Sequence, residues 1–176
     1  MIDRLEILRR EFDDGFARAA GERIVKTSPH LRLRAGSLQL AIPIGEVRAI
    51  ETGTSGSMGP RSGGTSVVVP LPGARPGLRG LIGVRGQLVP VYALGDLLGA
   101  GSASYCRWFL ITAGEKTAAL AFEEFGGLIG APADAVRPLA GSGPPHARAT
   151  LEMNGTTCWV IHLPELIGKL AEESTT

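Results

Sequence analysis

The sequence is poor in aromatic and charged residues, which make up 5% and 20% of its 176 residues. Its apolar share of 44% is too high for a disordered chain. No uninterrupted apolar run approaches the roughly 20 residues that a membrane-spanning helix needs. The apolar share excludes a disordered chain, and the lack of a long apolar run excludes a helical membrane protein. We therefore expect a soluble globular protein with no direct membrane insertion.

Side chains suited to metal binding are also scarce. Cys106 and Cys158 lie in apolar flanks typical of strand interiors, which makes a disulfide framework improbable. His30, His146 and His162 are far apart in the sequence, and no pair of cysteines or histidines has the spacing of a metal site. We therefore expect no metal and no cofactor. Because the N-terminus lacks the apolar centre of a signal peptide, the sequence predicts a cytoplasmic protein.

The signatures of catalysis are missing as well. The chain has no phosphate-binding loop, no dinucleotide-binding glycine motif and no nucleophile elbow. Adjacent Glu123 and Glu124 would point to opposite faces of a strand, so they cannot act as a paired acid and base. We predict that the protein is not an enzyme. The competing hypothesis is a hydrolase using Ser55, Ser57 or Ser62, and it requires one of these serines to lie near a histidine.

Positive charge is limited and of one kind. The net charge is only +1, and three of the 18 cations are lysines. Every cation between residues 31 and 100 is an arginine, whose planar head group favours bidentate contacts with partners. A small barrel that binds single-stranded nucleic acid is the alternative, but such a surface needs exposed aromatics and a basic groove. The composition therefore favours protein partners and predicts no nucleic acid.

Glycine and proline are abundant instead, at 25 and 12 residues, and they separate short apolar runs after residue 30. Alternating or continuous apolar character predicts eight strands, at residues 31–36, 37–50, 66–71, 88–94, 107–114, 117–125, 149–155 and 156–163. Residues 52–66 have no apolar periodicity, so we predict a mobile surface loop there.

An internal repeat organises these runs. Residues 84–99 align without a gap on residues 153–168, and each copy reads as a glycine turn, a buried strand and a short helix. A second similarity precedes it, between residues 33–42 and residues 111–122. Each half of the chain therefore contains one hairpin, a variable loop, a second hairpin and a short helix.

This order predicts a mainly β fold of two tandem five-stranded barrels, SH3-like or OB-like, that share a seam. The first barrel would span residues 29–100 and include the loop at 52–66. The second would span residues 101–176 and end in a C-terminal helix. A short helix would follow each barrel. Burying a shared face between the copies would leave a groove along the seam.

Residues 1–28 form a separate extension with a predicted amphipathic helix over residues 3–20. Its apolar residues recur at spacings of three and four, at Leu5, Leu8, Phe12, Phe16 and Ala19. This stripe has three candidate partners, which the sequence leaves open. They are the barrels of its own chain, a second copy through self-association, and another protein.

Residues 69–99, VPLPGARPGLRGLIGVRGQLVPVYALGDLLG, resemble the CheW-type coupling proteins, which link chemoreceptors to the chemotaxis histidine kinase. The residues that match this family's pattern are Pro70, Pro72, Gly80, Arg85, Gly86, Val89, Pro90, Val91 and Leu94. The runs at 41–50 and 120–129 look like the family's apolar strands. Gly83 replaces the usual asparagine and Ala93 the usual aspartate, which indicates an atypical member.

The resemblance implies two interlocked barrels, no catalysis and two protein-binding surfaces. One surface would receive the cytoplasmic tip of a chemoreceptor, and the other the regulatory domain of a CheA-type histidine kinase. The matching positions imply a receptor-binding groove at Ile82, Val84, Arg85 and Phe122. They imply a kinase-binding face at Glu46, Val47 and Arg48. The implied function is an adaptor at membrane-associated receptor arrays in chemotaxis or motility signalling, and a protein partner outside chemosensing is the alternative.

Overall fold

The computed structural model describes residues 27–55, 66–72, 77–101, 106–132, 134–153 and 155–173. The predicted helix over residues 3–20 lies outside these ranges. So do residues 56–65, the centre of the predicted loop. Within the described ranges, no helix is long and apolar enough to span a membrane.

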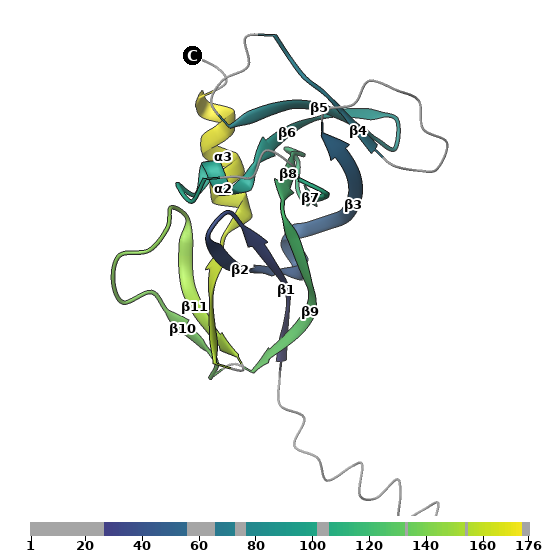
Figure 1. The fold of residues 1–176 in the computed structure, drawn as a ribbon. Coiled ribbons are helices and arrows are strands. Elements are labelled where there is room, and N and C mark those ends of the chain that lie inside the picture. Colours follow the sequence, from purple (N-terminus) through teal and green to yellow (C-terminus); the bar gives the residue numbers. More distant parts are fainter. Residues whose placement is uncertain are drawn as a thin grey trace, which may run out of the picture.

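In the described residues, twelve strands form two β units, one above the other in Figure 1. The lower unit consists of Thr27–Ala35 (β1), Leu38–Pro43 (β2), Glu124–Pro132 (β9), Val136–Pro138 (β10), Ala147–Met153 (β11) and Thr156–Ile161 (β12). These strands form an open sheet in the order β10-β11-β12-β2-β1-β9. The upper unit consists of Val47–Ser55 (β3), Ser66–Val69 (β4), Leu78–Val84 (β5), Gln87–Ala93 (β6), Trp108–Thr112 (β7) and Ala119–Phe122 (β8). These strands close into a barrel in the order β3-β4-β5-β6-β8-β7.

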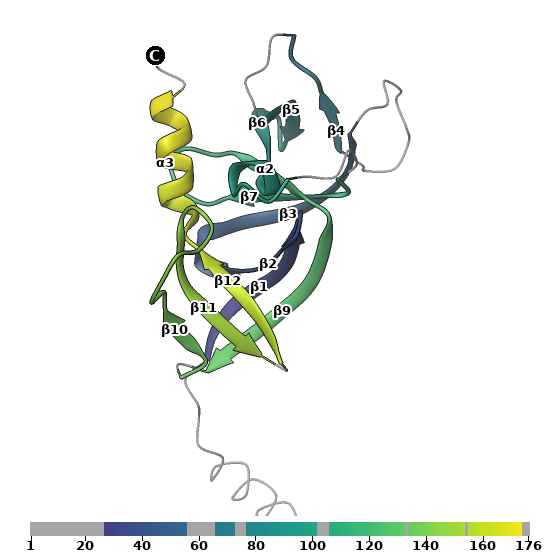
Figure 2. The same ribbon diagram turned by 60° about the vertical axis from the view of Figure 1, so that its left-hand side comes forward.

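The predicted mainly β architecture of two units is therefore confirmed, with six strands in each unit instead of five. A short 3-10 helix, Ile44–Glu46 (η1), connects β2 of the open sheet to β3 of the barrel. The predicted helix after each unit is present as Leu94–Leu97 (α2) and Leu163–Glu173 (α3). Figure 2 shows α3 rising from the open sheet along the side of the barrel.

The two halves of the chain exchange their first hairpins. The β1–β2 hairpin joins the strands of the second half, because β1 pairs with β9 and β2 pairs in parallel with β12. Reciprocally, β7 pairs with β3 and β8 pairs in parallel with β6 of the first half. The predicted boundary at residue 100 therefore does not separate the two units. The sequence repeat shows that each copy supplies two hairpins, but it carries no information on which copy completes which sheet.

The repeated segments occupy equivalent places in the two units. Residues 84–99 form the β5–β6 turn, β6 and α2, and residues 153–168 form the β11–β12 turn, β12 and the start of α3. The glycines of the two turns, Gly86 and Gly155, have positive φ angles of 81° and 73°, which favour glycine. The repeat seen in the sequence is thus a structural repeat.

The strand β3 extends further than the sequence indicates. It continues to Ser55, into the predicted loop at 52–66, and it pairs in parallel with β4 from Gly53 and Ser66 onward. Main-chain hydrogen bonds form this ladder, so the strand needs no apolar alternation. The loop prediction was therefore wrong at residues 52–55, whereas the predicted strand from residue 66 is present as β4.

The largest apolar core lies between the two units. It contains buried side chains from the open sheet, the barrel and both helices, among them Leu33, Leu40, Leu94, Leu120, Phe122 and Ile161. The β1–β2 turn packs closely on α2 and on the chain just after it, since a Cβ atom added at Gly95 would lie 3.1 Å from the nitrogen of Gly36, and one added at Gly36 would lie 2.1 Å from the carbonyl oxygen of Gly101. This shared core joins the two units, and each unit also has a smaller buried cluster of its own.

Candidate protein-binding surfaces

The structure separates the residues expected in the receptor-binding groove. Ile82 and Phe122 have no exposed surface, and they belong to different core clusters. They therefore do not line an open groove. Val84 is half-buried, and Arg85 is exposed at the β5–β6 turn, where its φ angle is 49°. Only Val84 and Arg85 of this predicted set are within reach of a partner.

An exposed apolar surface does lie at the seam, on β7 and β9. We call it the seam surface, and it consists of Arg107, Trp108, Phe125 and Leu128. Phe125 and Leu128 are 37% and 63% exposed. The ring centroids of Trp108 and Phe125 are 5.4 Å apart, and the guanidinium carbon of Arg107 lies 5.9 Å from the Trp108 centroid. Two aromatics, an aliphatic side chain and a stacked arginine are typical of protein interfaces.

The pairing of β9 with β1 explains why these side chains are uncovered. Leu128 lies opposite Leu31, and Phe125 lies opposite Leu33. Residues opposite each other in an antiparallel pair share one face of the sheet, and Leu31 and Leu33 are buried in the shared core. The strand β9 is the last of its sheet, and within the described residues no strand pairs with its outer edge. The buried apolar face thus continues onto an uncovered edge, which is typical of interaction sites.

Two further features of β1 and β9 shape this surface. The register shifts between Arg32 and Leu33, so Gly126 is an extra residue on β9 and both Phe125 and Leu128 remain on the same face. Beside Phe125, Glu124 accepts a hydrogen bond from Arg34 of β1. This bond lowers the pKa of the Glu124 carboxyl below its usual value. The charged pair therefore lies at the start of β9, and the alternation of the strands places it on the face opposite to Phe125.

A second apolar surface covers the outside of the barrel. We call it the barrel surface, and it consists of Val69, Leu81, Leu88 and Pro90 on β4, β5 and β6. Leu81 pairs with both Val69 and Pro90, and the alternation along β6 places Leu88 on the same outer face. Val69 and Leu88 are 57% and 74% exposed. The barrel that carries this surface also supplies Trp108 of β7 to the seam surface, whereas Phe125 and Leu128 come from β9 of the open sheet.

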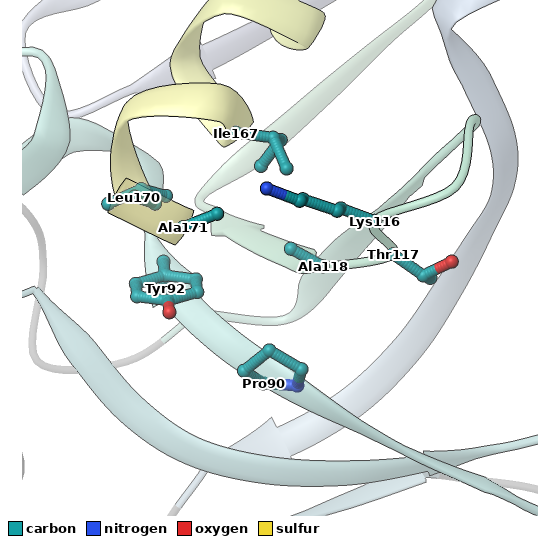
Figure 3. A pocket seen from close by; sticks show the side chains of 8 residues that line it. All are labelled: Pro90, Tyr92, Lys116, Thr117, Ala118, Ile167, Leu170 and Ala171. Atoms are coloured by element: carbon teal, nitrogen blue, oxygen red, sulfur yellow. The ribbon is translucent and has the colours of Figure 1, made fainter. Parts of the chain in front are cut away.

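The barrel surface continues from Pro90 into a cavity of about 340 Å³ between β6, the β7–β8 turn and α3. Figure 3 shows Tyr92 of β6 below Leu170 of α3, and Lys116 of the turn extending toward Ile167. Lys116 is the charged residue of the described lining. The cavity adds a concave apolar extension with one cation to the barrel surface.

The residues expected on the kinase-binding face have mainly structural contacts. One carboxylate oxygen of Glu46 accepts the backbone N–H of Leu163 at 2.7 Å, and the other lies 2.8 Å from Nδ1 of His162. Glu46 therefore caps the first turn of α3 from the linker between the two units. Val47 is half-buried against the shared core. Arg48 donates a hydrogen bond to the carbonyl of Gly114 at 3.2 Å. It is the exposed residue of the three, since Glu46 and Val47 are half-buried.

Comparison with known proteins identifies the family of this fold. A family model of the CheW-like domain matches residues 29–171. The chain belongs to the CheW-like domain family. Its fold is similar to the crystal structure of the scaffolding protein TtCheW from Thermoanaerobacter tengcongensis, with a TM-score of 0.63 and 15% sequence identity over 80% of this chain and 92% of that chain. No curated protein matches the sequence.

The two departures from the family pattern occupy different environments in this CheW-like domain. Gly83 is exposed on β5, and a Cβ atom added there would have no neighbour within 4 Å. Ala93 is buried at the N-cap position of α2, which has no side-chain capping hydrogen bond. The aspartate that the family usually carries here is a good capping residue, so its replacement removes a capping group from α2.

The thiols of the CheW-like domain are not activated. Cys106 and Cys158 are free and buried, as their apolar flanks predict. Burial raises the pKa of the Cys106 thiol to about 11 and also raises the pKa of Cys158. Both are therefore neutral at physiological pH, whereas a nucleophilic cysteine is a thiolate. Among the described residues, no three histidine, cysteine or acidic side chains form a metal-binding group. Ser57, Ser62 and the side chain of Ser55 lie outside the described part of the chain.

Replacing Glu46 by alanine should lower the free energy of unfolding by about 1–3 kcal/mol, because the Leu163 N–H and the His162 imidazole lose a shared acceptor in a partly buried place. Chemical denaturation followed by far-ultraviolet circular dichroism measures this. The control is Arg48→Ala, an exposed neighbour whose loss should change stability by less than about 0.5 kcal/mol. Equal stability of the two variants would show that the cap contributes nothing.

Proposed function

We propose that this CheW-like domain is a non-enzymatic cytoplasmic scaffold that couples chemoreceptors to a CheA-type histidine kinase. The observation that carries the proposal is the family match over residues 29–171. The two exposed apolar surfaces support it, because a coupling protein must hold two partners at once. One surface lies at the seam and the other on the outside of the barrel, so occupation of one leaves the other accessible.

The seam surface is the proposed docking site for the receptor. Receptor tips in this family are antiparallel helical bundles, and a helix docks by inserting apolar side chains into a groove. Trp108, Phe125 and Leu128 offer apolar contact area for such a helix, and Arg107 offers charge at the rim. Tryptophan and arginine are the residue types that most often dominate binding energy at interfaces. The proposed receptor site thus replaces the predicted set of Ile82, Val84, Arg85 and Phe122, two of which are buried, by side chains that a partner can touch.

The barrel surface is the proposed docking site for the kinase. The regulatory domain of a CheA-type kinase is homologous to this family, so the contact would join one β unit to another. Val69, Leu81 and Leu88 form an outward apolar face that such a contact would cover. At the adjacent turn, Val84 and Arg85 border this face, and Arg85 would supply a charged contact. The cavity beside α3 extends the same surface.

Charge substitutions on the two surfaces should separate the two partners. Leu128→Glu should weaken binding of a receptor tip by at least tenfold, about 1.4 kcal/mol, and leave binding of the kinase regulatory domain unchanged. Leu88→Glu should weaken binding of the kinase regulatory domain by at least tenfold and leave binding of the receptor tip unchanged. Calorimetric titration of the full chain with each partner measures both affinities, and each variant is the matched control for the other.

Two outcomes would contradict the proposal. If the wild-type chain binds neither a receptor tip nor a kinase regulatory domain, the coupling function is wrong. If either substitution weakens both partners equally while the fold is retained, one surface serves both partners, and the assignment of separate docking sites is wrong.

A further inference from the structure

The seam surface is an apolar face that the described residues leave uncovered. Leu128 is 63% exposed, whereas Leu31, directly opposite on β1, is 4% exposed. Phe125 and Trp108 extend the same face by an aromatic contact. Large apolar side chains that are grouped in this way at a sheet edge stabilise a protein when another element covers them.

The chain enters the fold close to this surface. The strand β1 begins at Thr27, which is paired with Pro132 at the end of β9. Figure 1 shows β1 and β9 running side by side from this point. Leu31 is four residues into β1, so Leu128 lies about 13 Å along the sheet from Thr27. Residues 21–26, which connect the N-terminal stripe to β1, can span up to about 20 Å. The stripe is therefore within reach of the seam surface of its own chain.

The stripe also matches the surface in length and chemistry. The helix predicted from the sequence over residues 3–20 would be about 27 Å long, and the nine-residue strand β9 is about 30 Å long. The stripe carries Leu8, Phe12 and Phe16 at helical spacing, which suits an aromatic and aliphatic receiving face. Tethering by a short connection makes this contact intramolecular, with an effective concentration in the millimolar range.

We propose that the N-terminal stripe, residues 5–19, docks on the seam surface of its own chain and occupies the site where a receptor helix would bind. The segment is then a built-in competitor, and a receptor tip must displace it to engage the scaffold. The competition rests on the proposed receptor site, whereas the docking itself rests on the contacts and reach of this chain.

The docking is tested in the full-length chain with two double variants. Phe12→Ser with Phe16→Ser removes the centre of the stripe. Arg10→Ser with Asp14→Ser changes the same number of residues to serine on the opposite face of the predicted helix. Each pair is made in a Trp159→Phe background, which leaves Trp108 as the fluorescence reporter of the seam.

Loss of the stripe should shift Trp108 emission to longer wavelength and speed amide hydrogen exchange in β7 and β9 severalfold, whereas the polar-face variant should match the parent. The stripe variant should also bind a receptor tip about tenfold more tightly. Unchanged emission and exchange in the stripe variant would overturn the docking. The docking within one chain would also be overturned if the amide protection of β7 and β9 disappeared on dilution, because the stripe on the seam surface would then belong to a second copy. If the stripe variant changes Trp108 emission and amide exchange but no variant binds a receptor tip, the docking is supported and only the proposed function is refuted.

Discussion

Replacing Phe122 by alanine is expected to lower the free energy of unfolding by about 3–5 kcal/mol. The Phe122 side chain has no exposed surface and packs in the core that the two units share. Its removal leaves a cavity between the open sheet and the barrel, which the surrounding strands can fill only in part. Thermal denaturation should show a fall in midpoint of about 2–4 °C for each kcal/mol lost.

The matched control for this change is Phe125→Ala, three residues along the chain. Phe125 is 37% exposed on the seam surface, so its truncation should cost much less stability and should weaken receptor binding instead. If Phe122→Ala folds as stably as the parent but loses receptor binding, the sequence-based assignment of Phe122 to the receptor groove is correct after all.

Gly95→Ala is expected to destabilise the fold by about 1–3 kcal/mol through overpacking. An added Cβ atom would lie 2.0 Å from the Gly101 carbonyl oxygen and 3.1 Å from the Gly36 nitrogen. Both neighbours are backbone atoms, so relief requires α2 to shift away from the backbone at Gly101 and from the β1–β2 turn at Gly36. Urea denaturation monitored by tryptophan fluorescence measures the loss.

Gly83→Ala is the control for Gly95→Ala. Gly83 lies in β5, where an added Cβ atom has no neighbour within 4 Å. Its substitution should leave stability within about 0.5 kcal/mol of the parent. Equal losses of stability in Gly95→Ala and Gly83→Ala would show that the close backbone approach at Gly95 does not limit the packing there.

The sequence predicted the elements of this fold well because they are local. The glycine turns at Gly86 and Gly155, the apolar strands that follow them and the helices after those strands depend on neighbouring residues. The repeat then indicated two related units. The choice between a copy completing its own sheet and exchanging hairpins depends on pairings such as His30 with Ile129, which are 99 residues apart and leave no local signal.

The candidate sites were harder to predict because a shift of one residue in a strand reverses which side chains are exposed. Phe122 and Ile82 were assigned to a groove by the family pattern, and both point into the core. Phe125 and Leu128 are three residues apart, which in a regular strand places them on opposite faces. The extra residue Gly126 brings them to the same face. Glu46 was read as a partner contact because its capping target, Leu163, lies 117 residues away.

The exchange of hairpins also sets the order in which the chain can fold during synthesis. Residues 47–122 contain every strand of the barrel, so the barrel can close before the last quarter of the chain has been made. The β1–β2 hairpin is synthesised first, yet its partners β9 and β12 are not complete until residue 161. The β1 edge of the hairpin therefore stays unpaired until β9 is made, at residue 132, and the β2 edge stays unpaired and open to other chains until β12 is made. The first strands that the ribosome makes are thus among the last to be fully paired.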